Sequence, residues 1–399
     1  MPILFLIVVI DLIGFGVIIP LLPFYAEYYQ ATPAQVGLVM ATYSLAQFIA
    51  APVWGRMSDR IGRKPVLLIS LAGAALSYVW LGYSETLWTL FAARAIGGFM
   101  AGNISTAFAY VADITTRENR ARGMGMIGAA FGLGFIVGPA VGGLLAGSDP
   151  VHADFRSPAL TAAAMSVVAF VLTLTILKES LSPEIRQRLA TQVPQSRRQQ
   201  FLKAITRPEV TRLLLISFLA TFAFAGLEAT FAMWSRRQFG WGPEQNGYLF
   251  AYIGVLGALV QGGLIGRLTK RFGEINLIVQ GAVALSVGIL LIPFSSTLPV
   301  LVIAMMIAAY GFSVISPALS SSLSLRAGEN EQGGMMGVSR SATTLARVAG
   351  PANAGFLFAY LGQNWPYYAG AAVMALVAIL ALRLRMKGSM TPETATGGN

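Results

Sequence analysis

Long apolar stretches are the feature that most constrains this chain. Segments of about 20 mostly apolar residues, each long enough to cross a bilayer, recur along it. Lipid offers no hydrogen bonds to the backbone, so such segments must be helices, and the period-two alternation of a membrane β-barrel is absent. We predict an all-α membrane protein with twelve transmembrane helices, at roughly 3–23, 34–54, 65–83, 86–112, 123–146, 158–177, 210–232, 244–265, 276–295, 298–321, 334–358 and 366–384.

Composition supports this fold class. Hydrophobic residues make up 55% of the chain and charged residues only 11%, whereas charged residues reach about 25% in soluble domains. A soluble core of this size has no room for so much apolar surface, and a bilayer accommodates it.

Basic residues lie mostly on one side of the predicted membrane. Of 28 Lys and Arg residues, 22 fall in segments on the side of the two termini, and only Arg156, Arg236 and Arg237 fall in opposite segments. Cytoplasmic loops carry the excess of Lys and Arg, so we expect both termini in the cytoplasm. The net charge of +11 therefore indicates topology, and we expect no nucleic-acid partner.

Several chemistries lack the residues that they need. The chain has no cysteine, its single histidine is His152, and it has no nucleotide-binding GxxxxGK[ST] sequence. These counts argue against thiolate or histidine metal sites, a Ser-His-Asp triad and ATP as the energy source. We expect no catalytic residues, no metal and no cofactor, and hence no enzyme.

The longest polar stretch divides the chain in two. It is rich in Arg, Gln, Ser and Pro, and it has six predicted spans on either side. The predicted domains are an N-terminal six-helix bundle at 1–177, a cytoplasmic linker at 178–209, a C-terminal six-helix bundle at 210–385 and a cytoplasmic tail at 386–399.

Two sequence motifs recur at nearly one offset, which indicates an internal repeat. GRMSDRIGRK at 55–64 is echoed by GRLTKRFGE at 266–274, an offset of 211, and Gly138-Pro139 is echoed by Gly350-Pro351, an offset of 212. Six is an even number, so the two halves have the same topology and form parallel repeats. This arrangement is typical of transporters whose substrate site lies near the midplane, between the halves.

Four motifs carry a family resemblance that extends over nearly the whole chain. They are Gly55–Lys64, the Asp11–Gly16 sequence DLIGFG, the Arg94–Gly98 sequence RAIGG, and Gly134–Gly143 with its Gly-Pro pair. They resemble motifs of the major facilitator superfamily, in particular its twelve-span drug:proton antiporters, with the tetracycline-efflux proteins as the nearest group. The resemblance implies two pseudo-symmetric six-helix bundles.

Ionisable residues inside spans are the candidates for proton coupling, because they are costly in hydrocarbon. At 1.5 Å per residue, Asp11 lies about 12 Å from the cytoplasmic face and Arg94 about 12 Å from the opposite face. In a hydrocarbon core about 30 Å thick their depths differ by only a few Å, so an ion pair between them is plausible. The alternative is a permanent structural pair. Glu228 is the third candidate for proton coupling. The alternative interpretation is that Glu228 is an acid at the outer rim of the membrane with no role in coupling.

The motif at 55–64 is the predicted cytoplasmic gate. Its two glycines are expected to permit tight turns, its aspartate to meet the positive amino end of the eleventh helix, and Arg63 to pair with Asp113. The alternative is that its basic residues only fix topology. The gating candidates are Gly55, Asp59, Arg60, Gly62, Arg63 and Asp113.

The fifth span carries the antiporter motif. By resemblance this motif seals the two halves against leak, while generic helix packing by small residues is the alternative. Its residues are Gly134, Gly138, Pro139, Gly142 and Gly143.

Sparse polar groups among aromatic residues suit recognition of amphipathic compounds. The predicted substrate-cavity residues are Tyr43, Gln47, Asn103, Phe222, Phe224, Tyr252, Gln261, Tyr310 and Arg347.

Two functions follow from these residues. The first is a proton-coupled efflux antiporter for amphipathic drugs or small organic metabolites. We expect it to be a monomer in a bacterial inner membrane, in contact with the membrane lipids. The family resemblance implies a role in antibiotic resistance. The second is a transporter or exchanger of organic anions or lipids that uses Arg94 and Arg347.

Overall fold

Helices account for all the regular secondary structure of the residues that the structure describes. This computed structural model describes residues 1–182, 184, 202, 206–327 and 332–388. Most of the predicted linker 178–209 and nearly all of the predicted tail 386–399 lie outside these ranges. The chain divides into two compact units.

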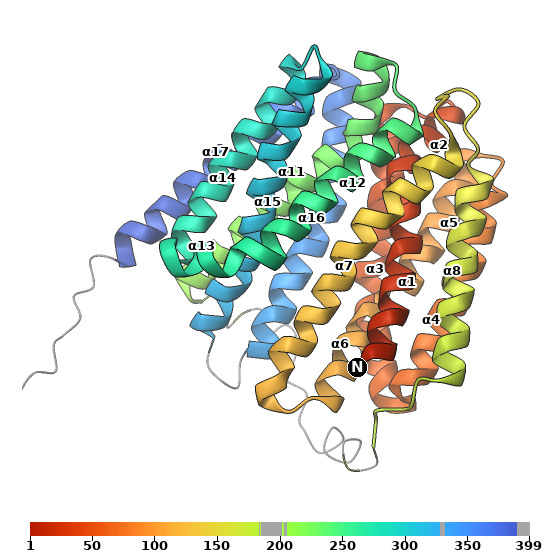
Figure 1. The fold of residues 1–399 in the computed structure, drawn as a ribbon, viewed down its shortest axis with the longest axis vertical. Coiled ribbons are helices and arrows are strands. Elements are labelled where there is room, and N and C mark those ends of the chain that lie inside the picture. Colours follow the sequence, from red (N-terminus) through yellow and green to blue (C-terminus); the bar gives the residue numbers. More distant parts are fainter. Residues whose placement is uncertain (183, 185–201, 203–205, 328–331, 389–399) are drawn as a thin grey trace, which may run out of the picture. The chain divides into compact units, whose positions relative to one another are not determined.

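Unit 1 comprises Met1–Gln195, Phe224–Ala258 and Thr344–Pro366. It holds the first half of the chain and parts of three long helices of the second half, α11 (Pro208–Phe239), α12 (Pro243–Leu259) and α16 (Gln332–Leu361). Its first-half elements are α1 (Pro2–Ile18), η1 (Ile19–Leu21), α2 (Leu22–Tyr28), α3 (Pro33–Ile61), α4 (Arg63–Gly82), α5 (Leu87–Met100), η2 (Ala101–Asn103), α6 (Ile104–Ile114), α7 (Arg117–Ala146) and α8 (Arg156–Thr175) (Figure 1).

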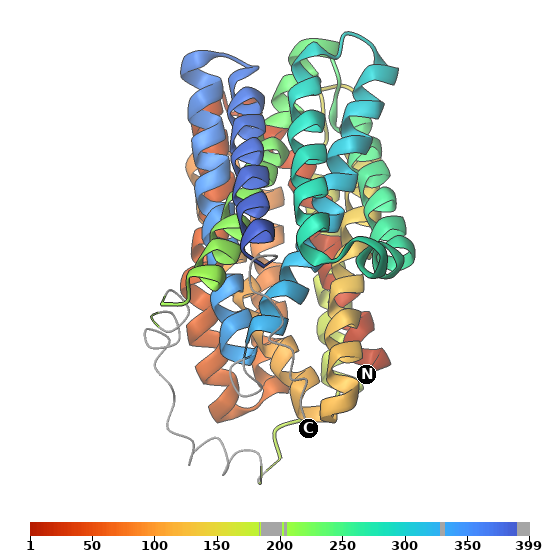
Figure 2. The same ribbon diagram turned by 90° about the vertical axis from the view of Figure 1, so that its left-hand side faces the viewer.

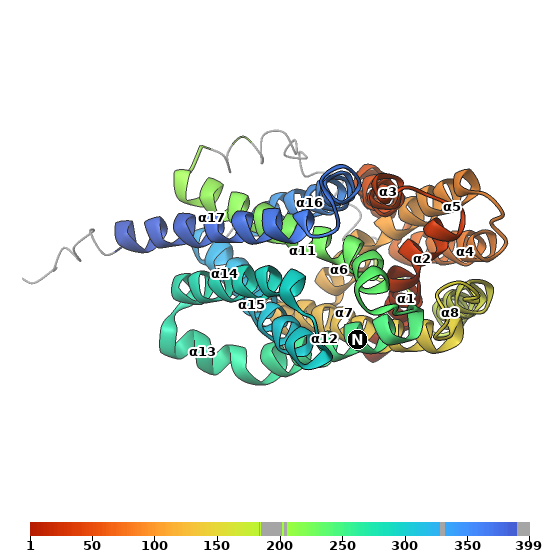
Figure 3. The same cartoon turned by 90° about the horizontal axis from the view of Figure 1, so that it is seen from above.

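Within unit 1, the first-half helices pack in pairs along their lengths. Helix α1 lies along α7 and α8, while α4 packs on α8 and α3 packs on α5 (Figure 3). Leu4, Ile7, Leu71, Val111 and Ile127, from the four helices α1, α4, α6 and α7, form part of one buried apolar cluster.

Unit 2 comprises Ser196–Ala223, Leu259–Thr343 and Tyr367–Asn399. Its central pair is α14 and α15, which form a hairpin and pack side by side (Figure 2). Besides the remaining parts of α11 and α16, its elements are the π-helical η3 (Val260–Leu264), α13 (Ile265–Phe272), α14 (Glu274–Leu291), η4 (Ile292–Phe294), α15 (Leu298–Arg326) and α17 (Trp365–Gly388).

Local sequence explains where these helices begin and end. Thr32 and Gln35 form a capping box at the start of α3, where Pro33 occupies the first helical position. Gly62, with φ 111°, separates α3 from α4, and Gly273, with φ 75°, separates α13 from α14. These glycines are 211 residues apart, so the repeat predicted from sequence recurs in backbone geometry.

All twelve predicted spans fall on helices or continuous helical runs. Among the described residues, eleven helices are long and apolar enough to cross a membrane. The helix outside that set is α16, which carries Arg347 and many small and hydroxyl residues. The predicted domain boundaries remain a prediction.

Candidate functional site

The centre of the candidate site lies where α3 and α5 approach each other closely. Gly98 of α5 faces the backbone of Tyr43 of α3 directly, and a Cβ at Gly97 would lie 3.7 Å from the Tyr43 ring. Because these glycines carry no side chain, Arg94, one turn earlier on α5, lies over the Tyr43 ring, with 4.1 Å between its guanidinium carbon and the ring centroid. The sequence RAIGG thus positions this arginine.

Tyr43 links three helices of unit 1. Its ring stacks on Phe15 of α1, with centroids 5.1 Å apart, and carries Arg94 of α5. Tyr43 also interacts electrostatically with Asp11 and Arg347. Arg94, predicted for proton coupling, therefore contacts Tyr43, which was predicted for the substrate cavity.

The predicted Asp11–Arg94 ion pair is not among the ion pairs of the described residues. Arg94 is 5% exposed, and its Nε is buried without a hydrogen-bond partner. Asp11 is half-buried, with no hydrogen bond to the described part of the chain. Similar depth in the membrane does not bring the two side chains together, because depth leaves the rotation of each helix undetermined.

Glu228 and Arg347 instead form an ion pair within unit 1. Arg347 Nη1 lies 3.7 Å from Glu228 Oε2, and the Glu228 side chain is 6% exposed. The sequence provided both residues as candidates but not their pairing, since they lie on helices about 120 positions apart.

The other predicted cavity residues fall in both units, and two of them have hydrogen-bond partners within unit 1. Gln47 Nε2 donates to the Ala101 carbonyl at 3.2 Å, and Asn103 Nδ2 donates to Ser70 Oγ at 2.6 Å, so both amides join neighbouring helical segments. Phe224 and Tyr252 belong to unit 1, and Phe222, Gln261 and Tyr310 to unit 2. Their contact with substrate remains a prediction.

The predicted cytoplasmic gate contains a buried charge network. Arg63 Nε donates to Asp113 Oδ2 at 2.9 Å, and the side chains are 3% and 10% exposed. Its Nη1 donates to Ser58 Oγ at 2.8 Å and also pairs with Asp59. The predicted Arg63–Asp113 pair is confirmed, while Arg60 is exposed.

Gly55 does not form a tight turn. It lies within α3, and the turn between α3 and α4 is at Gly62 alone. The helix continues past its apolar segment with Arg56, Asp59 and Arg60 as exposed polar side chains. The predicted contact of Asp59 with the amino end of α16 stays a prediction.

Glu179 was missed by the sequence reasoning, which assigned it to the linker. Its two carboxylate oxygens accept the backbone N–H groups of Arg63 at 2.9 Å and Lys64 at 3.0 Å. An acid at a helix amino end is favourable because it satisfies free N–H groups. Its position directly after a span was the available signal.

The antiporter-motif glycines of α7 pack against the backbone of α1. A Cβ at Gly134 would lie 2.8 Å from Leu12, one at Gly138 would lie 2.6 Å from Gly16, and Gly142 faces Val17. Small residues allow such backbone contact. The helix that carries Asp11 is therefore held directly by α7, next to the interior Pro139.

Two helix crossings in unit 1 share one PxxxG pattern. Gly37 and Gly355 approach each other where α3 crosses α16, and Gly143 and Gly247 do so where α7 crosses α12. In each crossing the glycine also faces the carbonyl of a proline four residues before its partner glycine. The pattern starts at Pro33, Pro139, Pro243 and Pro351, so offsets of 210 and 212 were a repeat signal that the sequence reasoning overlooked.

An ion pair lies at the same end of unit 1 as these crossings. Arg236 Nη1 lies 3.0 Å from Glu27 Oε2, joining the end of α2 to the end of α11. Arg237 lies 4.0 Å from the other Glu27 oxygen and stacks over Phe358. The crossings and this pair join helices of the first sequence half to helices of the second.

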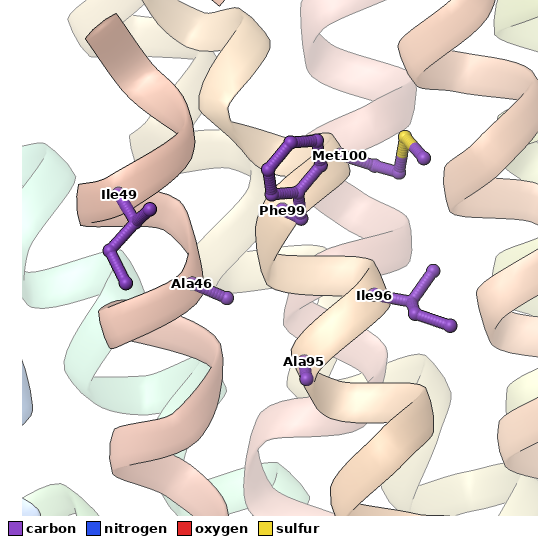
Figure 4. A pocket seen from close by; sticks show the side chains of 6 residues that line it. All are labelled: Ala46, Ile49, Ala95, Ile96, Phe99 and Met100. Carbon is purple, nitrogen blue, oxygen red and sulfur yellow. The ribbon is translucent and has the colours of Figure 1, made fainter. Parts of the chain in front are cut away.

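A groove of about 350 Å³ lies between α3 and α5. Its lining is apolar and includes none of the predicted cavity residues; it consists of Ala46, Ile49, Ala95, Ile96, Phe99 and Met100 (Figure 4). With no polar group to orient a ligand, it is distinct from the charged cluster at Tyr43. Within the described ranges, no group of three His, Cys, Asp or Glu residues is placed to hold a metal ion.

Comparisons with known proteins agree with this architecture. The family model of the Major Facilitator Superfamily matches residues 4–338 and, in a second match, 256–398. The tetracycline resistance protein, class C, of Escherichia coli is 32% identical over 400 residues, which cover 98% of this chain and 97% of that protein. Multidrug resistance protein 2 of Bacillus subtilis (strain 168) is 32% identical over 367 residues, covering 91% and 89%.

A solved structure gives the same result. The crystal structure of the human organic anion transporter MFSD10 (TETRAN) superposes with a TM-score of 0.73 and 28% identity, covering 95% of this chain and 98% of that one. The predicted fold class is confirmed, and the family and relatives are transporters. The chain is a multi-pass membrane protein that belongs to the major facilitator superfamily.

Proposed function

We propose that the chain is a proton-coupled antiporter that exports amphipathic organic compounds by alternating access. The single observation that carries the proposal is Asp11, a carboxylate within an apolar helix that has no hydrogen bond or ion pair to the described part of the chain. A carboxylate in this setting binds a proton more readily than one held in a salt bridge, because no cation stabilises its charged form. The tetracycline and multidrug resistance relatives support export of such compounds.

The packing of α1 supports a mechanical role for Asp11. Its helix contacts α7 backbone to backbone at Gly16 and Gly138, so a change in hydration or charge at Asp11 acts on the helix that also crosses α12 at Gly143. Proton binding on one side and release on the other would then bias two arrangements of the same helices.

The second half contributes the other ionisable pair. Glu228 is buried and held by Arg347 at 3.7 Å, a separation long for a charge-assisted hydrogen bond. Protonation of Glu228 would free Arg347, which makes this pair the second candidate proton carrier.

Two contact sets are candidates for the gates. The Arg63 network would stabilise the arrangement closed toward the cytoplasm, and the PxxxG crossings with Glu27–Arg236 would stabilise the arrangement closed on the opposite side. Both sets are formed in this structure, so alternation would require each set to break in turn as its side opens. The proposed setting is a bacterial inner membrane, with cytoplasmic termini and a monomeric chain.

A second candidate function has one specific observation in its favour. The human relative of solved structure is named an organic anion transporter, and this chain buries Arg94 over the ring of Tyr43. A facilitator or exchanger of organic anions would move its substrate without protons.

The test is a substrate panel in proteoliposomes with an imposed pH gradient. Ethidium, tetracycline and naphthoate represent a cation, a zwitterion and an anion. Uptake driven by the pH gradient and abolished by a protonophore supports antiport. Flux of naphthoate that follows membrane potential alone, with no effect of the pH gradient, contradicts it and supports the second function.

A further inference from the structure

Arg94 is a buried cation that the proton-coupling scheme leaves without a partner. Its Nε is buried and has no hydrogen-bond partner, and no carboxylate of the described residues pairs with it. Its guanidinium carbon lies 4.1 Å from the centroid of the Tyr43 ring. The attraction between a cation and an aromatic face offsets only part of the hydration free energy that the charge loses on burial.

The other charged groups in reach of Tyr43 do not neutralise Arg94. Arg347 is already paired with Glu228. Asp11 interacts electrostatically with Tyr43, but it forms no ion pair with Arg94. Glu228 and Arg347 therefore form an ion pair, whereas the guanidinium of Arg94 has no ion-pair partner among the described residues.

The shape of the guanidinium defines what would bind it. A guanidinium that meets an aromatic ring keeps its N–H groups in its own plane, and the Nε of Arg94 is a buried donor with no hydrogen-bond partner. A planar guanidinium edge matches the two oxygens of a carboxylate in two parallel hydrogen bonds. Phe15, stacked on Tyr43, adds an aromatic surface beside the site.

We propose that Arg94, supported by Tyr43, is the subsite that binds the carboxylate of a transported organic acid. The proposal rests on the proposed function in that the ligand is a transported compound, and it narrows the substrate class to amphipathic carboxylates. It also separates two roles, because Arg94 binds substrate while Asp11 is left to carry the proton.

The test is calorimetric titration of the purified full-length protein with naphthoate and with naphthamide, its neutral isostere. Wild-type protein is expected to prefer the carboxylate by about tenfold or more, the range of a charge-assisted hydrogen bond. Arg94→Gln is expected to reduce this preference to about one, and Arg94→Lys to retain part of it because the charge remains. Partial retention also shows that substitution at this site does not merely unfold the protein.

Arg156→Gln is the matched control. Arg156 also lies over a tyrosine ring, 4.4 Å from the centroid of Tyr83, but it is exposed and lies at one end of unit 1. This variant is expected to keep the full preference. Equal binding of the two ligands by wild-type protein, binding of neither, or an Arg94→Gln variant that keeps the preference would overturn the proposal.

A loss of preference in Arg347→Gln, with none in Arg94→Gln, would assign the carboxylate to the other arginine and overturn the proposal as well. No ion gradient is present in this titration. A normal preference in a protein that transports without proton exchange would therefore contradict the proposed function and leave the carboxylate subsite standing.

Discussion

Arg63 shows how one residue can hold several helix ends together. Its guanidinium binds Asp113 and Asp59, and its backbone N–H donates to Glu179, so α3, α4, α6 and the segment after α8 meet at one residue. Removing one partner of a buried pair leaves the other charge uncompensated.

We therefore expect Arg63→Gln to lower the free energy of unfolding by about 3 kcal/mol. Arg60→Gln, three residues away and exposed, is expected to change it by less than about 0.5 kcal/mol. Thermal unfolding in detergent measures both. Equal effects of the two substitutions would show that the network adds nothing beyond local charge.

At the scale of the helix, α7 carries glycines in two different environments. A Cβ at Gly138 would lie 2.6 Å from the Gly16 Cα, whereas a Cβ at Gly132 would meet nothing within 4 Å. Gly138→Ala is expected to destabilise the protein by about 1–3 kcal/mol, because neither backbone can move freely. Gly132→Ala is expected to be neutral or slightly stabilising, since alanine favours a helix.

Measurements of thermal unfolding, export and proton leak together distinguish a sealing role of the antiporter motif from a role in helix packing alone. A Gly138→Ala protein that melts earlier and also leaks protons supports the sealing role of the antiporter motif. Unchanged melting temperature in Gly138→Ala would contradict the backbone contact itself.

Two ion pairs of similar length allow a test of helix movement. Glu27–Arg236 joins α2 to α11, across the two sequence halves, and Glu209–Arg326 joins α11 to α15, within the second half; each is 3.0 Å long. The chain has no native cysteine, so each pair can be replaced by two cysteines and bridged with a short bifunctional maleimide.

Bridging positions 27 and 236 is expected to stop export, because it fixes one gate shut. Bridging positions 209 and 326 is expected to leave most of the activity, because both helices belong to one half. Full export by the bridged 27–236 protein would show that this end of the molecule does not open during transport.

At the scale of the whole molecule, hydropathy was sufficient to predict the fold class. Each apolar stretch must be a helix in lipid, and the offset of 211 between Gly62 and Gly273 identified the two halves. Helix ends were less predictable, since α3 continues as a polar helix beyond its apolar segment.

The candidate site was predictable in its members but not in its pairs. The cost of burying charge identified Asp11, Arg94, Glu228 and Arg347, and a position along a helix gave their depth. Pairing depends on how each helix is rotated, which is determined by close contacts such as those of Gly98 with Tyr43. Those contacts depend on tertiary packing that a single sequence does not specify.

The central claim is that Asp11 carries the transported proton. The most direct measurement is substrate-induced proton release from proteoliposomes, followed with a pH-sensitive dye, for wild-type protein and Asp11→Asn. The amide has nearly the shape of the carboxylate but takes up no proton, so we expect substrate binding to persist and proton release to vanish. Proton release by Asp11→Asn at the wild-type rate and stoichiometry would contradict the account.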